Sequence, residues 1–388
     1  MHLICVPSPC CRRAAVRPAA EDARRKNAEF APATPIVYRK TVSKSRQIPA
    51  RRGNGQPRRR FFLLSDGVNG YTTKMDLEAN IKQKGLELGF DRIGITSAEP
   101  LEPKYGEYHR QWLENGCAGR MYYLYRNNDK RFAPNRLLTG AQSVICVALN
   151  YRPRQEDVAD DQSPSISRYA LYDDYHGFIK TRLFELAAFV QSLCPDRPLK
   201  FKACTDAIPL AERALAHRAG LGLIGRNHAL IHPELGGMIF LGELLTTLPL
   251  KPDEPLMGDY CAECGRCIAA CPTGALGADG AFDARRCLSY LTIEEPDEID
   301  EEFADKMAGR LFGCDACLMA CPMVRNAPPR TDRGLRFYSE RARLGPKDVL
   351  TWKQADFDAV CKGSPIERIG LIRLRRNACL GAKSDESV

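Results

Sequence analysis

Eight of the chain's 17 cysteines stand between residues 261 and 321, in two groups with short and similar spacing. The first group reads Cys261-x2-Cys264-x2-Cys267-x3-Cys271-Pro272, and the second reads Cys314-x2-Cys317-x3-Cys321-Pro322, with Cys287 upstream. A cubane iron–sulfur cluster needs four converging thiolates, and two-residue gaps let one turn of chain reach three of its iron atoms. The cysteine that leads into a proline points away and reaches a second cluster. The spacing therefore predicts two 4Fe–4S clusters that exchange one ligand each.

This exchange assigns Cys261, Cys264, Cys267 and Cys321 to cluster one, and Cys271, Cys287, Cys314 and Cys317 to cluster two. The alternative is a pair of zinc sites, because paired C-x2-C sequences also bind zinc. Zinc does not account for the triple spacing that ends in Cys-Pro, so the pattern favours iron–sulfur. We interpret the nine other cysteines, Cys117 and Cys146 among them, as ordinary buried thiols.

Chain length and cysteine usage exclude several classes of protein. Disulfide scaffolds are usually short secreted chains, whereas 388 residues can bury a sizeable core in two or three domains. Clustered cysteines in a long chain indicate metal binding in a reducing compartment, so we expect a cytoplasmic protein. No apolar run approaches the roughly 18–20 residues of a membrane helix, so no membrane partner is expected.

The positive charge of the chain gathers at its N-terminus. Residues 1–74 hold 16 Lys/Arg and 4 Asp/Glu, whereas the rest of the chain holds 41 and 44. Because the leader lacks amphipathic periodicity, we predict that it is disordered, lies outside the native fold and precedes a true start near Met75. The string Arg59-Arg60-Phe61 resembles a twin-arginine export signal, but no apolar h-region follows it. An Arg-rich transit peptide is the other alternative.

The elements that must hold the chemistry follow this leader. The periodicity predicts a helix with Ile81, Leu86 and Leu88 on its apolar face, a helix over residues 178–193, and another after Pro209. Apolar runs predict strands over residues 92–96, 143–149 and 238–245. We therefore expect an α/β or α+β domain over residues 75–250, a two-cluster ferredoxin-type domain over 251–330, and a basic helical segment over 331–388.

Several segments outside the cysteine spacing carry a second pattern. They are residues 167–170 (SRYA) before 174–176 (DYH), 205–213 (TDAIPLAER), 219–227 (AGLGLIGRN), 242–245 (GELL) and 287–294 (CLSYLTIE). Together, over roughly residues 75–380, they resemble the epoxyqueuosine reductase family. The resemblance implies a cobalamin-binding catalytic domain, a two-cluster ferredoxin domain and the start of a HEAT-like helical part, so this chain is similar to a short-tailed member.

The resemblance also implies an activity. Such an enzyme reduces epoxyqueuosine to queuosine at the wobble position of tRNA, the last step of queuosine biosynthesis, and the epoxide oxygen leaves as water. The reductant would be cob(I)alamin, base-off and without a protein ligand below the cobalt, supplied with electrons through the two clusters. The implied partners are tRNA carrying epoxyqueuosine and an external low-potential electron donor, with the enzyme acting as a monomer.

Asp206 is the predicted catalytic residue. From the sequence alone it is equally an acid near a helix N-terminus, because an apolar stretch precedes it and a helix follows. The family places a proton donor at the matching position, and burial beside a corrin would raise the pKa of such an acid. Glu212 and Glu243 are weaker candidates, which we expect to form ion pairs or caps.

Other residues are predicted to line the cobalamin pocket. They are Arg126, Arg131, Tyr169, Asp206, Arg226, Asn227, His228 and Tyr290. His176 is not among the expected cobalt ligands, since the glycine after it stands two places too early for the Asp-x-His-x-x-Gly signature. The string Gly220–Gly225 has the Gly-x-Gly-x-x-Gly form but follows a helix, so we discount a dinucleotide site and expect it at the corrin pocket.

Two other functions are alternatives to this interpretation, and a surface for tRNA is a further expectation. A cobalamin-dependent reductive dehalogenase would normally carry a complete export signal, and a ferredoxin-type electron carrier would lack a corrin. Basic side chains near the C-terminus could meet tRNA phosphates or form a solvated helix face. These are Arg336, Arg341, Arg343, Arg368, Arg373, Arg375 and Arg376.

Overall fold

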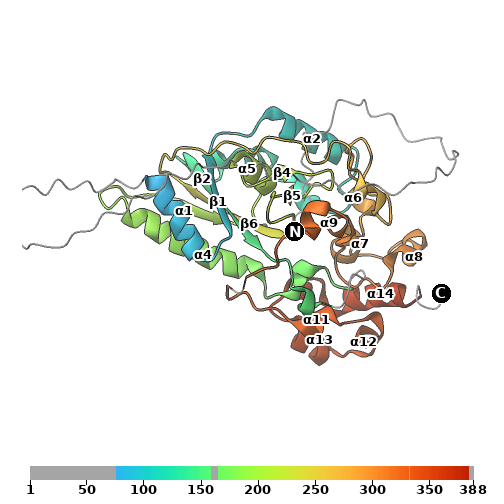
Figure 1. Ribbon diagram of the computed structural model, residues 1–388. Helices are drawn as coiled ribbons and strands as arrows, with labels where there is room; N and C mark the ends of the chain where they lie inside the picture. Colours follow the sequence, from blue (N-terminus) through green and yellow to red (C-terminus); the bar gives the residue numbers. More distant parts are fainter. Residues whose placement is uncertain (1–75, 159–164, 332, 384–388) are drawn as a thin grey trace, which may run out of the picture. The chain divides into compact units, whose positions relative to one another are not determined.

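The computed structural model describes residues 76–158, 165–331 and 333–383 (Figure 1). The basic leader predicted over residues 1–74 lies outside these residues. Contacts gather the described residues into one unit rather than separating them near residues 250 and 330, so those two domain boundaries stay predictions. Within the described chain, no helix is both long and apolar enough to cross a membrane.

A four-stranded sheet with the order β1-β2-β6-β3 forms the centre of the fold, and every neighbouring pair is antiparallel. This topology corresponds to the α+β form of the prediction and not to a parallel α/β sheet. A separate hairpin pairs β4 with β5. The strands are β1 (Arg92–Ser97), β2 (Ser143–Asn150), β3 (Phe201–Cys204), β4 (Leu223–Ile224), β5 (Leu230–Ile231) and β6 (Ile239–Thr246).

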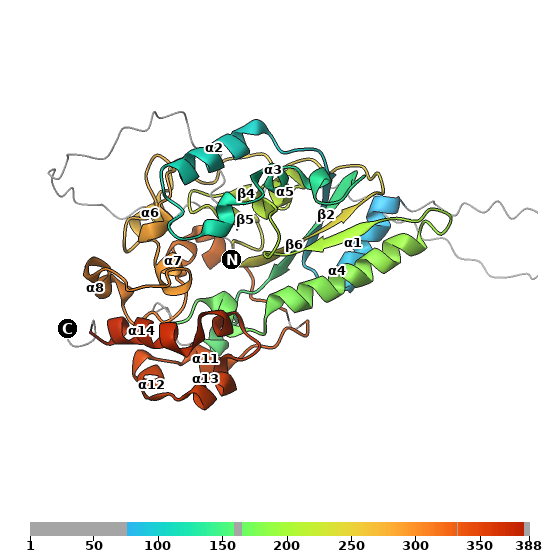
Figure 2. The same cartoon turned by 180° about the vertical axis from the view of Figure 1, so that it is seen from behind.

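Both faces of the sheet are covered, which explains why β2 is apolar along its whole length. Ile145, Val147 and Leu149 pack in one hydrophobic cluster, while Val144 and Cys146 belong to the cluster on the opposite face. Helices α1 (Leu77–Glu87) and α4 (Tyr175–Ser192) lie side by side on the first face, and α5 (Glu212–Arg218) packs against β1, β2 and β6 (Figures 1 and 2).

Most of the predicted elements are present, with small differences at their ends. The three predicted strands correspond to β1, β2 and β6 within one residue at each end. Helix α4 begins earlier than predicted, because the Asp174 side chain caps it by accepting the His176 N–H at 2.9 Å. Helix α5 begins at Glu212, three residues after Pro209. The apolar face predicted for α1 is only partly correct, since Ile81 is buried but Leu86 is 41% exposed.

The remaining helices are mostly short. They are α2 (Pro103–Glu114), α3 (Asn128–Arg131), α6 (Arg266–Ala269), α7 (Leu288–Ile293), α8 (Ala304–Met307), α9 (Ala316–Met319), α10 (Pro322–Arg325), α11 (Ser339–Ala342), α12 (Pro346–Thr351), α13 (Gln354–Cys361) and α14 (Gly370–Lys383). The C-terminal segment is thus helical, as predicted. Its last helix is tied to the cysteine region by the buried Asn377, whose amide donates to the carbonyl oxygens of Thr292 at 2.9 Å and Leu311 at 2.8 Å.

Candidate functional site

The eight clustered cysteines surround two cavities. Cys261, Cys264, Cys267 and Cys321 line the first, and Cys271, Cys287, Cys314 and Cys317 line the second. We call these the first and second cysteine cavities. The two quartets are the same sets that the spacing predicts, including the exchanged fourth cysteine from each Cys-Pro pair. Short helices produce this arrangement, because Pro322 opens α10 directly after Cys321 and so turns the chain away from Cys317.

The arrangement fits a multi-atom cluster better than a single zinc ion. A single zinc ion would need the four sulfurs of a quartet drawn close around it, at the usual Zn–S distance of about 2.3 Å. Each quartet instead borders a cavity, so it offers both the four thiolate donors and the space that a cubane cluster requires.

The β4–β5 hairpin separates the two cysteine cavities. Asn227, at the hairpin tip, lines both of them, and its amide donates to the Cys317 carbonyl oxygen at 3.5 Å. Gly225 allows the close approach, because a side chain there would lie 3.6 Å from the Cys261 sulfur and 2.9 Å from Asn227. The Gly-x-Gly-x-x-Gly string therefore leads into a hairpin rather than a helix, and it borders a cysteine cavity.

A third cavity, which we call the aspartate cavity, adjoins the second cysteine cavity through shared wall residues, Arg213 and Ala229. Its lining is mainly apolar and aromatic, with Asp206 and Glu212 as its acidic members. Asp206 comes from the loop between β3 and α5. The full lining is Tyr151, Tyr169, Tyr175, Asp206, Ala211, Glu212, Arg213, Ala229, Leu230, Gly237, Ile239, Phe240 and Leu241.

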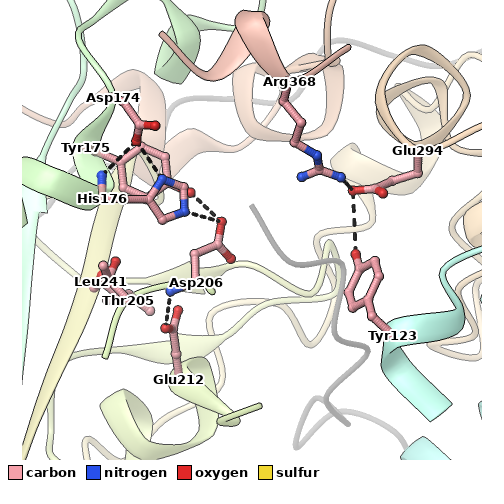
Figure 3. Close-up of polar contacts among 10 residues, drawn as sticks. All are labelled: Tyr123, Asp174, Tyr175, His176, Thr205, Asp206, Glu212, Leu241, Glu294 and Arg368. Atoms are coloured by element: carbon pink, nitrogen blue, oxygen red, sulfur yellow. Dashed lines mark hydrogen bonds and ion pairs between the residues drawn. The ribbon is translucent and has the colours of Figure 1, made fainter. Parts of the chain in front are cut away.

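Asp206 also lines an outer cavity, formed with α4 and the C-terminal segment. Its carboxylate oxygen Oδ2 accepts a hydrogen bond from the Tyr175 hydroxyl and lies 3.7 Å from His176 Nε2 (Figure 3). The other imidazole nitrogen of His176 is 2.6 Å from Asp174 Oδ1. Burial disfavours the charged imidazole, but the hydrogen bonds and charges of Asp174 and Asp206 outweigh it and raise the pKa of His176 to about 9.

Two further carboxyls lie behind Asp206. The Asp206 N–H donates to Glu212 Oε1 at 2.5 Å, and Glu243, on β6, is fully buried. Burial, followed by the nearby Glu212 and Asp206 carboxyls, raises the pKa of Glu243 well above its usual range. Burial and the Asp206 charge likewise raise the pKa of Glu212. Glu212 caps the loop by accepting the Asp206 N–H, whereas Glu243 interacts with the Glu212 carboxyl instead of forming the ion pair or cap that was expected of it.

Arg368 faces Asp206 across the outer cavity. It comes from the C-terminal 3-10 turn Pro365–Ile369 and pairs with Glu294, whose carboxylate also accepts from the Tyr123 hydroxyl at 3.5 Å (Figure 3). The cavity thus has an acidic and aromatic side around Asp206 and a basic side at Arg368. That arrangement can place a polar substrate between a proton donor and a cation.

Only Tyr169 and Asp206, of the residues predicted for the cobalamin pocket, line the aspartate cavity. Arg226, Asn227 and His228 border the cysteine cavities instead. The three others line none of the cavities described above. Arg126 is exposed, Arg131 is buried and donates at 3.5 Å to the carbonyl oxygens of Tyr123 and Arg126, and Tyr290 accepts the Arg120 N–H at 2.8 Å.

The basic C-terminal residues lie in different environments. Arg341 is 1% exposed and donates to the carbonyl oxygens of Tyr172 at 2.7 Å and Val360 at 2.8 Å, so its suggested contact with tRNA phosphate is wrong. Arg373, Arg375 and Arg376 also donate to backbone carbonyls. Arg336 and Arg343 are exposed, and Arg368 lines the outer cavity.

Sequence reasoning missed Tyr175 and Arg213 as members of the site and treated His176 only as a discarded cobalt ligand. A signal for the first of these was present, because the Asp174-Tyr175-His176 string belongs to the pattern quoted above. Arg213 had the same kind of signal, because it ends the quoted segment 205–213, but its place between two cavities depends on how α5 packs against the hairpin.

Comparisons with known proteins agree on one family. A family model described as "4Fe-4S double cluster binding domain" matches residues 260–324, and the model of epoxyqueuosine reductase QueG matches residues 131–207. The epoxyqueuosine reductase of Salmonella typhimurium is 39% identical over 313 residues, which is 78% of this chain and 79% of that protein.

Solved structures extend the likeness to the fold. A crystal structure of epoxyqueuosine reductase with an epoxyqueuosine-modified tRNA-Tyr stem loop has a TM-score of 0.72 and 28% identity, covering 79% of this chain and 81% of that one. The Bacillus subtilis enzyme, described with an aspartate-bearing catalytic loop swung out of its active site, has a TM-score of 0.71 at 28% identity, with the same coverage of 79% and 81%.

Proposed function

The chain belongs to the epoxyqueuosine reductase family, and on that premise we propose that it reduces epoxyqueuosine to queuosine in tRNA with Asp206 as the proton donor. The observation that carries the assignment is the position of Asp206. Its carboxyl borders a cavity that shares two wall residues, Arg213 and Ala229, with the second cysteine cavity. A proton source and the end of an electron path are thereby neighbours. The dehalogenase and electron-carrier alternatives are not favoured by the family match.

The reaction sets clear requirements for the protein. Converting the epoxide to an alkene consumes two electrons and two protons, breaks both carbon–oxygen bonds and releases the oxygen as water. A positioned acid must protonate the oxygen as the ring opens, which typically contributes about 10²–10⁴-fold to such a step. The electrons must arrive from outside the active site, because no cysteine thiol, the side chain that can act as a reductant, lines the aspartate or outer cavity.

The two cysteine quartets are the proposed holders of the clusters. When bound, the clusters supply one-electron carriers at low potential. Cys261, Cys264, Cys267 and Cys321 would hold cluster one, and Cys271, Cys287, Cys314 and Cys317 would hold cluster two. The first and second cysteine cavities share Asn227, and the second shares Arg213 and Ala229 with the aspartate cavity, so the two clusters, when bound, would stand in sequence toward Asp206.

The aspartate cavity is the proposed cobalamin site. Its aromatic and aliphatic lining fits the apolar face of a corrin, and such a cofactor, when bound, supplies a strongly reducing cobalt centre. Tyr169 and the residues of β6 that line the cavity would contact the cofactor. His176 is not expected to bind the cobalt, because one imidazole nitrogen is engaged with Asp174 and the other faces Asp206.

Proton delivery involves a pair of side chains rather than Asp206 alone. The Asp206 carboxyl accepts a hydrogen bond from the Tyr175 hydroxyl, and the same oxygen lies 3.7 Å from His176 Nε2, so a proton held on His176 can reach it. With its pKa near 9, His176 holds the proton at neutral pH and lies 3.7 Å from the Asp206 oxygen that would pass it on. Asp206 therefore delivers the proton, and His176 replaces it.

Substrate binding is proposed at the outer cavity. The relative solved with a modified tRNA stem loop supports tRNA as the partner, and Arg368 is the basic C-terminal residue that stands opposite Asp206. A cation there can contact a phosphate or a ribose hydroxyl of the modified nucleotide. A tRNA substrate also favours a cytoplasmic location; the electron donor and the monomeric state stay predictions.

One experiment tests the function directly. The protein, reconstituted without oxygen with iron, sulfide and cobalamin, is incubated with a strong chemical reductant and with tRNA from cells that accumulate epoxyqueuosine. Nucleoside mass spectrometry should show queuosine appearing as epoxyqueuosine disappears. A corrin absorbance spectrum of the desalted protein serves as the check on cofactor binding. Protein that holds both cofactors yet leaves epoxyqueuosine unchanged would contradict the assignment.

A further inference from the structure

The loop that carries Asp206 is held at two points on its β3 side. The Thr205 hydroxyl donates to the Leu241 carbonyl oxygen at 2.9 Å, and the Asp206 N–H donates to Glu212 Oε1 at 2.5 Å (Figure 3). Beyond them the loop reaches the surface at Ala207. We propose that Glu212 is a positioning residue whose carboxyl latches this loop through the Asp206 N–H and so fixes the direction of the Asp206 side chain. This inference rests on the acid role proposed above.

The backbone at Asp206 shows why a latch is needed. Its φ of 51° is left-handed, a conformation that few residues other than glycine adopt, although aspartate tolerates it better than most. Such a conformation persists only where the surroundings hold it. With it, the N–H points to Glu212 while the carboxyl points the opposite way, toward Tyr175 and His176 (Figure 3). A right-handed or extended backbone at this residue would change the direction of the N–H relative to the carboxyl.

The surroundings of Glu212 show what kind of contact the latch is. Behind it lies Glu243, fully buried, and burial raises the pKa of both carboxyls. A protonated carboxyl still offers its carbonyl oxygen to the Asp206 N–H, so the latch requires an acceptor atom and not a charge. An amide side chain at position 212 offers the same oxygen in the same place, whereas an apolar side chain leaves the Asp206 N–H without a partner.

Three substitutions in the reconstituted holoenzyme test the latch. Glu212→Gln should match the parent protein in hydrogen exchange of peptides spanning residues 205–211. Glu212→Leu should speed exchange of those peptides by about tenfold, equivalent to about 1.4 kcal/mol. It should also lower kcat by a similar factor and leave the KM for tRNA unchanged, because Glu212 does not line the outer cavity. If the leucine variant loses its iron, Glu212→Met replaces it.

Glu243→Gln is the matched control. It changes the buried carboxyl behind Glu212, which does not accept the Asp206 N–H, and an amide there can still bond to the Glu212 carboxyl, so exchange of the loop peptides should stay at the parent rate. The latch is overturned if Glu212→Leu leaves exchange unchanged, or if Glu212→Gln is as damaged as Glu212→Leu, which would assign an ionisable proton to Glu212. Absence of turnover in the parent protein would remove the proposed function, and the exchange measurement would still decide on the latch.

Discussion

The cysteine cavities and the aspartate cavity adjoin one another but are built in different ways. Every cysteine of the first two comes from residues 261–321, in short helices and turns that carry little of the sheet. The aspartate and outer cavities draw their walls from residues as distant as Tyr151 and Arg368. A cluster brings its own geometry, so the protein has only to present thiolates. No cofactor positions a carboxylic acid in this way, so its pKa and its direction depend on the residues that the fold places around it.

Loss of one cysteine should therefore have the largest effect. Cys271→Ser should abolish turnover and lower the iron content from about eight to about four atoms per chain, because four thiolates hold each cluster. Cys271 lines the second cysteine cavity although its sequence neighbour Cys267 lines the first. Cys267→Ser is the control and should spare cluster two. Electron paramagnetic resonance of the reduced proteins distinguishes the clusters, and loss of the same cluster in both variants would refute the exchange of ligands.

Asp206→Asn should have the next largest effect. The amide cannot supply a proton as the epoxide opens, so turnover should fall by about two orders of magnitude or more. Iron content, the corrin spectrum and tRNA affinity should stay unchanged. Asp173→Asn is the matched control, because that carboxylate accepts from the Tyr338 hydroxyl at 2.6 Å and borders neither the aspartate cavity nor the outer one. Near-normal turnover in Asp206→Asn would leave water or another acid as the donor.

The two regions also differ in how far sequence alone could predict them. The cysteine quartets follow from spacing, because a ligand three residues away can reach the same cluster whatever the rest of the fold does. Strands such as β2 were equally predictable, since their apolar run needs two covered faces. Asp206 was found only through the family resemblance. Its contacts with Tyr175 and Glu212 depend on a left-handed backbone angle and on packing between β3, α4 and α5.

Other positions show the same dependence on packing. Arg226 and His228 were predicted at the corrin pocket, and the hairpin places them at the cysteine cavities, so their contact with a corrin stays a prediction. Arg341 was expected either to meet tRNA phosphate or to lie on a solvated face, but its guanidinium fills a buried site between backbone carbonyls. The type of a residue does not indicate which neighbour its side chain meets.

His176 gives a smaller effect that depends on pH. Its pKa near 9 means that the imidazole is charged below that pH, so turnover should be level around neutrality and fall as pH rises through about 9. His176→Gln should lower turnover at neutral pH by about tenfold, less than loss of the acid itself, and should remove the alkaline fall. The measurement is a pH profile of single-turnover rates between pH 6 and about 10. An unchanged alkaline fall in His176→Gln would assign it to a different group.

Arg368 should show a modest effect confined to binding. Because its side chain is largely exposed, the contact with tRNA is worth at most about 1 kcal/mol, so Arg368→Gln should raise the KM for tRNA about fivefold and leave kcat nearly unchanged. Arg343→Gln, an exposed arginine that does not line the outer cavity, is the control. Equal effects from both variants would indicate a diffuse basic surface instead of a contact beside Asp206.

The smallest effect is expected from removal of the leader. This removal tests whether the described residues alone supply everything that the cysteine cavities and the aspartate site need. Residues 1–74 lack the apolar pattern of a core, so a chain that begins at Met75 should fold, take up about eight irons and turn over at the parent rate. Their net positive charge can still attract tRNA weakly at low salt, and such an attraction should vanish at physiological ionic strength. Affinity for tRNA is therefore measured for both chains across a salt series.

If the shorter chain loses turnover at ordinary salt while keeping its clusters and corrin, the leader is a tRNA-binding arm. The aspartate site would then depend on a segment beyond the fold that surrounds it, whereas the cysteine quartets would not.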